Sequence, residues 1–459
     1  MTSRTGLATA LCCAILLCAP SALAQPPAAN QMPSVIQVPA EAQATPRFDA
    51  TAATNAYLAQ IPADKTARSD AYFEGGYWMI LWDFLYGTVV ALLLLNLRWS
   101  ARMRDLAERV TGFKPGQTSS NDSRPWLIKI LLELCSIFLY WLQYLVLATI
   151  LVFPLTVYED YFREHKYGLA TQTFGPWMGD QMKDLGVNLV LGGLLAMLLF
   201  GIVRRLPRTW WIWGAVVTTL FLIFVSLIAP VFIFPIFNKV TRLDDPKIVD
   251  PILSMARANG IPAKNVYEID ASRQTTRMSA NVSGFANTMR ITLNDNLLRR
   301  GSPEEIQAVM GHEMGHYVMN HVYKGIMFFL IVTVLAFACL HWALDWTLQR
   351  WGEKWQIRGV GDTAVLPLVV LLVSIFSFVI TPVTNTFIRT QEYEADMYGL
   401  NTSRQPDGAA QGAIHLGEYR KMNPGPIEEW IFFDHPSGRN RIYAAMRWKA
   451  ENLKLFTGH

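Results

Sequence analysis

Six apolar stretches are the feature that most constrains this chain of 459 residues. Each is long enough to cross the hydrocarbon core of a bilayer, which requires about 20 helical residues. Only 17% of the residues are charged, whereas soluble domains contain about 25%, so the composition also indicates a membrane protein. The net charge of +4 is too small to indicate a nucleic-acid partner. The stretches are residues 77–97, 126–158, 185–203, 210–237, 325–346 and 364–387.

The N-terminus has the pattern of a secretory signal peptide. An arginine precedes an apolar core, and Ala22-Leu23-Ala24 forms an A-x-A cleavage site before Gln25. We expect residues 1–24 to be removed, and an uncleaved signal anchor is the alternative. Residues 25–70 begin with a stretch rich in alanine, proline, glutamine and threonine, and we predict a flexible exported tail.

Two polar blocks, residues 238–323 and 388–459, interrupt and follow the later apolar stretches. Neither is large enough to fold readily as an independent domain. We therefore expect one domain, residues 238–459, that includes the last two spans. Residues 71–237 then form a separate membrane region with four spans. Within the first block, the pattern predicts a helix over 246–259 and strands over 265–270 and 289–295.

The distribution of lysine and arginine predicts the topology. Basic residues concentrate in the loops 98–125, 204–209 and 347–362, whereas the loop 158–184 has three basic and five acidic residues. The positive-inside rule places the three basic loops in the cytoplasm, which agrees with an exported N-terminus. We therefore expect a multi-pass protein of a bacterial-type inner membrane whose polar blocks face the periplasm.

The stretch "EEIQAVMGHEMGHYVMNH" carries the strongest chemical signal. Ser302 and Glu305 can form a capping box that starts a helix. His312 and His316 are four residues apart on that helix and share one face, where two imidazoles can bind one Zn²⁺. Glu313 is placed to take a proton from water at that metal. The plain alternative is a pair of polar histidines on a surface helix.

A catalytic zinc site of this kind needs a third protein ligand. "IRTQEYEADMYGL" offers Glu392 as that ligand and, four residues later, Asp396 to accept the free N–H of a ligand histidine. Glu394 in the same stretch has the character of a solvated helix face. His321 is five residues from His316, so we expect a supporting or boundary position for it. Gly311 and Gly315 indicate that another element packs closely on the zinc helix.

A last motif is "DHPSGRNRI", which contains His435 and, six residues later, Arg441. If both side chains converge on the metal, they can stabilise the oxyanion that forms when water attacks an amide. The alternative is a turn at a helix start with a surface arginine.

These motifs, in this order, resemble the type I CAAX prenyl protease family of integral-membrane zinc endopeptidases, which are related to HtpX-like proteases. The resemblance extends from about residue 68 to the C-terminus. It implies an α-helical membrane protein in which a ring of about six helices surrounds a chamber, with a gluzincin-like α+β catalytic domain. It also implies one Zn²⁺ held by His312, His316 and Glu392, with Glu313 as general base and His435 with Arg441 steadying the transition state. Substrate would pair with an edge strand that contains Ala280, Asn281, Val282, Ser283 and Gly284.

Two departures from the family pattern affect the expected substrate. The chain has Ser279-Ala280-Asn281 where the family has Asn-Ala followed by an aromatic residue. A signal peptide also stands in place of the extra N-terminal span of eukaryotic members, which puts the active site on the exported side. Prenylated proteins are made in the cytosol, so we expect membrane or unfolded exported proteins as substrates instead.

We therefore predict a zinc metalloendopeptidase that lies in the bilayer and takes polypeptides in extended conformation. Processing of a defined C-terminal, prenyl-type substrate is the alternative enzymatic reading. A non-catalytic membrane chaperone that kept the fold is the alternative outside enzymes, and the intact Glu313 argues against it. An intramembrane protease is disfavoured because Glu304, Glu305 and Gln307 make the zinc helix too polar for lipid. The sequence carries no signal for a particular oligomeric state.

Overall fold

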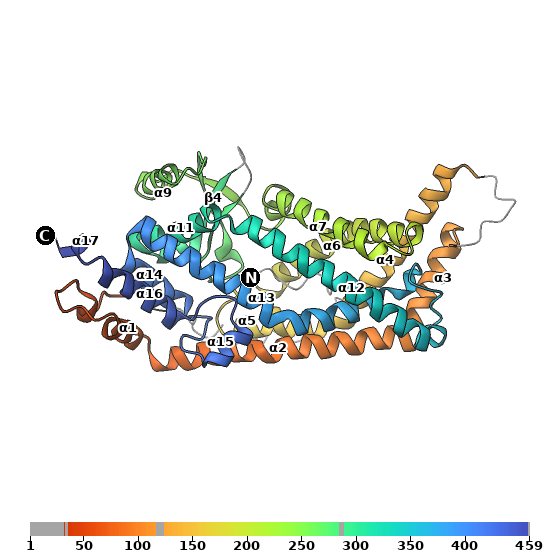
Figure 1. Ribbon diagram of the computed structural model, residues 1–459, viewed down its shortest axis with the longest axis horizontal. Helices are drawn as coiled ribbons and strands as arrows, with labels where there is room; N and C mark the ends of the chain where they lie inside the picture. Colours follow the sequence, from red (N-terminus) through yellow and green to blue (C-terminus); the bar gives the residue numbers. More distant parts are fainter. Residues whose placement is uncertain (1–31, 33–34, 116–123, 284–288, 458–459) are drawn as a thin grey trace.

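Six long helices dominate the structure. The computed structural model describes residues 32, 35–115, 124–283 and 289–457, and Figure 1 shows the helices running along its longest axis. The six helices predicted from the sequence are confirmed as long and apolar enough to cross a membrane. They are α2 (Ala63–Asn96), α4 (Trp126–Thr156, continuing through η3, Val157–Arg163, and α5, Glu164–Lys166), α6 (Phe174–Arg205), α7 (Trp210–Ile228), α12 (His321–Trp355) and α13 (Leu366–Ser403, preceded by η7, Thr363–Val365).

The fourth span changes its winding where its prolines lie. Pro230 and Pro235 lack a backbone N–H and predict a kink or stop there. The structure has a π-helical turn, η4 (Ala229–Ile233), followed by the single turn α8 (Phe234–Phe237). A wider π turn accommodates a missing hydrogen bond, so the polypeptide leaves the span at this point and enters the sheet.

The spans pack on one another through a shared apolar core. Its buried side chains include Tyr140 and Leu145 of α4 and Leu344 of α12, and they also come from α3 (Trp99–Thr111). On the outer face of α7, by contrast, Leu220 and Leu227 are 60% and 56% exposed. Apolar side chains on an outer helix face are suited to contact with lipid rather than water.

A small four-stranded sheet lies beside one end of the helices. Its order is β1 (Val240–Leu243), β2 (Val266–Ile269), β4 (Arg290–Asn294) and β3 (Ala280–Ser283), with β2 and β4 parallel and the other pairs antiparallel. The strands predicted over 265–270 and 289–295 are confirmed as β2 and β4. Strand β3 lies at the edge of the sheet, as the family resemblance implies for the substrate strand.

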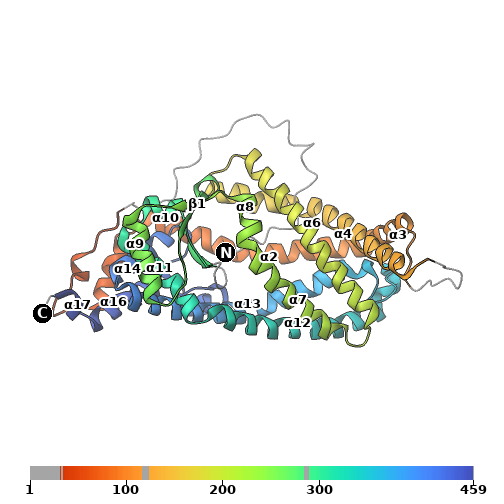
Figure 2. The same ribbon diagram turned by 90° about the horizontal axis from the view of Figure 1, so that it is seen from above.

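The remaining helices gather with the sheet at this end, whereas α3 lies at the opposite end of the long helices (Figures 1 and 2). The helix predicted over 246–259 is confirmed as α9. Ile252 of α9, Ile291 of β4 and Met310 of α11 share one buried apolar cluster. The helices are α9 (Pro246–Ala258), η5 (Ala271–Arg273), α10 (Asp295–Arg300), α11 (Pro303–Val318), α14 (Pro406–Leu416), α15 (Pro426–Phe432), α16 (Gly438–Glu451) and α17 (Lys454–Thr457).

The three basic loops lie together at the α3 end. Arg104 donates a hydrogen bond to the carboxylate of Asp362, and both side chains are buried. Arg204 donates to the carbonyl of Gly361 over 3.0 Å, and Arg98 donates to the carbonyl of Lys354 over 3.0 Å. The loops that follow α2, α6 and α12 therefore share one end of the molecule, away from the sheet.

The prediction of a flexible tail over residues 25–70 is wrong for the part that the structure describes from residue 35. Asp49 caps α1 (Ala50–Ala59), and Tyr57 is fully buried against the C-terminal helices. The Tyr57 hydroxyl donates to Asp407 over 2.9 Å. The face of α1 that packs is made largely of small residues such as Ala53, so it lacks the apolar stripe that identifies an amphipathic helix. The short helix η2 (Ala40–Ala42) precedes it, and the predicted signal peptide lies outside the described residues.

Candidate metal centre

The helix that carries the two histidines starts where its cap predicts. Ser302 Oγ accepts from the backbone N–H of Glu305, and the Glu305 carboxylate accepts from the backbone N–H of Ser302. Pro303 occupies the first turn, where its missing N–H costs nothing. The capping box sets the first turn of α11, and His312 and His316 follow on one face of it.

Glycines allow α11 and α13 to lie in very close contact. A Cβ atom on Gly399 would lie 2.7 Å from the backbone nitrogen of His312, and one on Gly311 would lie 2.9 Å from the carbonyl oxygen of Gly399. A Cβ atom on Gly315 would lie 3.1 Å from Cα of Ala395. The sequence predicts close packing at Gly311 and Gly315, and the partner is the helix that carries Glu392.

Three side chains converge from these two helices. Nε2 of His312 lies 3.2 Å from Nε2 of His316 and 3.2 Å from Oε2 of Glu392. Nε2 of His316 lies 3.5 Å from Oε1 of Glu392. One ligand atom from each residue lies within 4.8 Å of the other two, and together they form a group that could hold a metal ion.

The chemistry of this donor set fits a zinc ion. Two imidazole nitrogens face each other, while the other nitrogen of each ring already has a partner: Asp396 for His312 and His321 for His316. Oε2 of Glu392 is buried and has no hydrogen-bond partner of acceptable geometry among the described residues, although it lies near two rings. A cation between these atoms would satisfy all three, and two histidines with one carboxylate are a common zinc ligand set.

Asp396 and Arg441 lie behind His312. Oδ1 of Asp396 lies 2.8 Å from Nδ1 of His312, which is the position predicted for a residue that fixes the histidine tautomer. Arg441 donates from both Nε and Nη2 to the same carboxylate, with the Nε bond at 2.9 Å. The sequence interpretation places Arg441 at the oxyanion, but its guanidinium is directed at Asp396. Both guanidinium contacts with Asp396 lie on the side of His312 away from Glu392 and His316.

His435 and Glu313 complete the surroundings of the three ligands. Nε2 of His435 lies 3.2 Å from Oε2 of Glu392, and its Nδ1 lies 2.8 Å from Asp434. Burial, followed by the charge of Arg420, lowers the pKa of His435, which favours its neutral form. Burial raises the pKa of Glu313 to about 7, although His312 opposes the shift. A carboxylate with a pKa near neutrality is suited to accept and return a proton.

The pKa of His312 is raised and that of His316 is lowered. Burial disfavours the charged form of His312, but the neighbouring carboxylates of Asp396 and Glu392 outweigh it and raise the pKa of His312 to about 10. Burial and the neighbouring His312 lower the pKa of His316 to about 4. A metal ion at this site would therefore compete with a proton on His312.

A second set of contacts lies on the His316 side, where the sequence predicts a supporting or boundary position for His321 but does not identify its partners. His321 is buried beside His316, and its other nitrogen lies 3.0 Å from Oε2 of Glu394. Glu394, for which the sequence predicts a solvated position, is 35% exposed and also accepts from Lys324 over 2.6 Å. Only the five-residue separation of His316 and His321 hinted at this arrangement.

The predicted substrate strand lies next to α11. Residues Ala280, Asn281, Val282 and Ser283 form β3, which is partly exposed and contacts α11. One side of β3 pairs with β4, with Val282 opposite Ile291, and its other side is the edge of the sheet. Gly284 lies outside the described residues.

Two family models match the chain. The one described as "Peptidase family M48" matches residues 242–449, and the one described as "CAAX prenyl protease N-terminal, five membrane helices" matches residues 49–239. Four of the six candidate spans lie in the second region, among its described residues. The two matches follow each other directly and contain every residue of the candidate metal centre.

Several known proteins are similar to this chain. The chain is 32% identical over 281 residues to an uncharacterized metalloprotease, YhfN, of Bacillus subtilis, which is 61% of this chain and 66% of the relative. It is 29% identical over 318 residues to CAAX prenyl protease 1 of Saccharomyces cerevisiae, covering 65% and 69% of the two chains. The crystal structure of S. mikatae Ste24p has the same fold, with a TM-score of 0.64 and 22% identity over 84% of this chain and 89% of that one. The chain therefore belongs to peptidase family M48 and is a membrane-embedded metalloprotease that resembles the CAAX prenyl proteases.

Proposed function

We propose that the chain is a zinc-dependent endopeptidase with His312, His316 and Glu392 as the metal ligands. The observation that carries this proposal is the convergence of two imidazole nitrogens and one carboxylate within 4.8 Å of one another. The Nδ1 atoms of His312 and His316 contact Asp396 and His321. The lone pairs on their Nε2 atoms are therefore left for a metal ion. A bound Zn²⁺ would supply Lewis acidity toward the scissile carbonyl and toward water.

The residues of the chain would then carry the proton and steady the charge. The Glu313 carboxylate takes a proton from the attacking water and returns it to the departing amine. Nε2 of His435 lies 3.2 Å from Glu392 and its Nδ1 lies 2.8 Å from the Asp434 carboxylate, so His435 in its protonated form would donate a hydrogen bond from Nε2 to the developing oxyanion. Arg441 acts one step away, because it holds the carboxylate of Asp396 that orients His312.

We propose that substrates bind in extended conformation along β3. The edge of this strand offers backbone N–H and C=O groups for one further strand, and α11 lies directly beside it. Backbone pairing is insensitive to sequence, so a strand-adding site suits a protease that cleaves diverse polypeptides.

We further propose an inner-membrane location with the metal centre on the exported side. The basic loops 98–125, 204–209 and 347–362 lie together at one end, through contacts such as Arg104 to Asp362, and the candidate centre lies at the other end. Positive loops are retained in the cytoplasm. This orientation favours unfolded membrane or exported proteins as substrates, whereas the names of the eukaryotic relatives suggest a prenylated C-terminal substrate.

The test of the proposed centre compares three purified proteins: wild type, Glu392→Ala and Glu313→Gln. Zinc content and cleavage of an unfolded peptide are measured for each. Glu392→Ala is expected to lose the metal, and Glu313→Gln is expected to keep one zinc per chain and lose activity. Full cleavage by Glu313→Gln would exclude this residue as the base. Activity against unfolded rather than C-terminally prenylated peptides would separate the two substrate classes.

A further inference from the structure

The second ligand histidine is backed by another histidine. Nδ1 of His316 lies 2.9 Å from Nδ1 of His321, on the side of the ring away from His312 and Glu392. Only 4% of His321 is exposed, so water does not compete freely for this contact. Two imidazole nitrogens at this distance can share only one hydrogen, and the other nitrogen must accept it.

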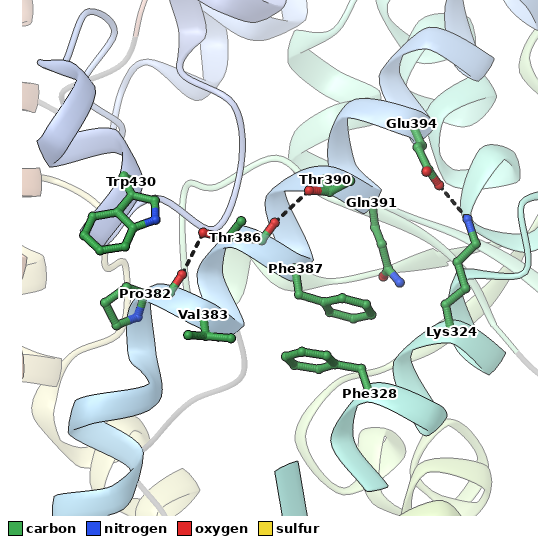
Figure 3. Close-up of a pocket in the computed structure, with 10 residues that line it drawn as sticks. All are labelled: Lys324, Phe328, Pro382, Val383, Thr386, Phe387, Thr390, Gln391, Glu394 and Trp430. Atoms are coloured by element: carbon green, nitrogen blue, oxygen red, sulfur yellow. Dashed lines mark hydrogen bonds and ion pairs between the residues drawn. The ribbon is translucent and has the colours of Figure 1, made fainter. Parts of the chain in front are cut away.

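The contacts of His321 continue outward to a charged pair. Nε2 of His321 lies 3.0 Å from Oε2 of Glu394 on α13, and Nζ of Lys324 donates to the same oxygen over 2.6 Å. The side chains of Lys324 and Glu394 are 43% and 35% exposed. Figure 3 shows this pair at the edge of an open pocket whose lining also includes apolar residues such as Phe328 and Phe387. The contacts therefore run from the buried ligand to an accessible carboxylate.

The turn between the two helices builds this arrangement. Asn320 has φ of 59° and ψ of 34°, a left-handed conformation that asparagine tolerates better than most residues. It separates the end of α11 from the start of α12, so that His321, the first residue of α12, returns toward His316. The exposed carboxylate comes from α13, which is packed on α11 through the glycine contacts.

We propose that His321 and Glu394 are positioning residues that hold His316 for metal binding. When Nε2 of His316 faces the metal, its hydrogen is on Nδ1 and is donated to Nδ1 of His321. His321 then carries its own hydrogen on Nε2 and donates it to Glu394, whose charge Lys324 balances. Each hydrogen in this series of hydrogen bonds points away from the metal. The lone pair on Nε2 of His316 is therefore free for coordination.

This assignment rests on the proposed metal centre and deepens it. This series of hydrogen bonds parallels the contacts behind His312, where Asp396 accepts from Nδ1 and Arg441 balances the charge. Each ligand histidine would thus have its own carboxylate, one reached directly and one through a second imidazole. The carboxylate behind His316 is the exposed one, so it can be altered without opening the core.

The experiment measures zinc affinity by competition with a chelator, with the absorption spectrum of the Co²⁺-substituted protein as a second readout. The variants are His321→Leu, which removes both hydrogen bonds, His321→Gln, which keeps an acceptor and a donor, and Glu394→Gln, which removes the charge. Tyr393→Phe is the matched control, because Tyr393 is 52% exposed on the same helix turn. His312→Ala tests the metal centre itself.

His321→Leu and Glu394→Gln are expected to lower zinc affinity by about 10- to 100-fold and to alter the Co²⁺ spectrum. His321→Gln should recover most of the affinity, and Tyr393→Phe should match wild type. Wild-type affinity in His321→Leu and Glu394→Gln, with metal lost in His312→Ala, would overturn the positioning role alone. Metal retained in His312→Ala would instead overturn the proposed centre. If His321→Leu does not fold, Glu394→Gln decides the question.

Discussion

The carboxylate of Asp396 contacts both His312 and Arg441. It accepts from His312, and the guanidinium fork of Arg441 holds it in place. A carboxylate behind a metal-binding histidine fixes the tautomer and raises the basicity of the ring. The role of Arg441 therefore depends on whether its effect on the reaction passes through Asp396.

Asp396→Asn is expected to lower zinc affinity by about 10- to 100-fold, because the amide keeps the shape but removes the charge. Arg441→Met should also loosen the metal if the guanidinium acts through Asp396. Equilibrium zinc binding and steady-state kinetics are measured for both variants. A lowered kcat at wild-type zinc affinity in Arg441→Met would place Arg441 at the oxyanion, as the sequence interpretation has it.

Tyr57 is expected to make stability fall at high pH. Burial, followed by the charge of Asp407, raises the pKa of this phenol in the folded protein. A raised folded pKa gives stability that is complete below the unfolded pKa of about 10 and is lost as the pH rises above it. Tyr57→Phe removes this slope and also a hydrogen bond, at a cost of about 1 kcal/mol at neutral pH.

The check is the melting temperature of both proteins between pH 8 and 11. The difference between wild type and Tyr57→Phe should shrink as the pH rises, because other tyrosines and lysines titrate equally in both. A constant difference across this range would mean that the Tyr57 hydroxyl is not held in the protonated form by its surroundings.

At the scale of elements, the contact between α11 and α13 sets the distance between the two histidines and Glu392. The contact has no room for side chains at Gly399, since an added Cβ would lie 2.7 Å from the His312 nitrogen and 3.0 Å from its Cα. Backbone atoms cannot rotate away, so α13 itself would have to move.

Gly399→Ala is therefore expected to destabilise the protein by about 1–3 kcal/mol and to weaken zinc binding. The matched control is Gly186→Ala in α6, where an added Cβ would meet nothing within 4 Å. That change should be neutral or stabilising, because alanine favours helix by about 1 kcal/mol over glycine. Thermal unfolding and zinc content are measured for both, and equal behaviour of the two variants would contradict the close contact.

At the scale of the whole molecule, the separation of the basic loops from the metal centre predicts which side each end faces. We introduce single cysteines at Asn440, exposed on α16, and at Arg109, exposed on α3, after replacing all five native cysteines with alanine. A membrane-impermeant thiol reagent should label Asn440→Cys in cells with an intact inner membrane. Arg109→Cys should react only after that membrane is opened. The reverse pattern would place the active site in the cytosol and favour a prenylated substrate.

Local geometry made a large part of this protein predictable. Six apolar stretches, the capping box at Ser302 and the spacing of His312 with His316 each depend on residues within one helix. Helical periodicity is a property of the sequence itself, so the candidate ligands could be named before the fold was known. Searching for an apolar stripe did not predict helix α1, because small residues form most of its packed face.

Contacts between distant residues were decided only by the tertiary structure. His321 and Glu394 are 73 residues apart, and Asp396 and Arg441 are 45 apart. The sequence shows that these side chains exist and on which helix each lies, but their partners depend on how the helices pack. The close approach of α11 and α13 therefore determined which carboxylate stands behind each histidine, while the sequence alone determined the spans and the histidine pair.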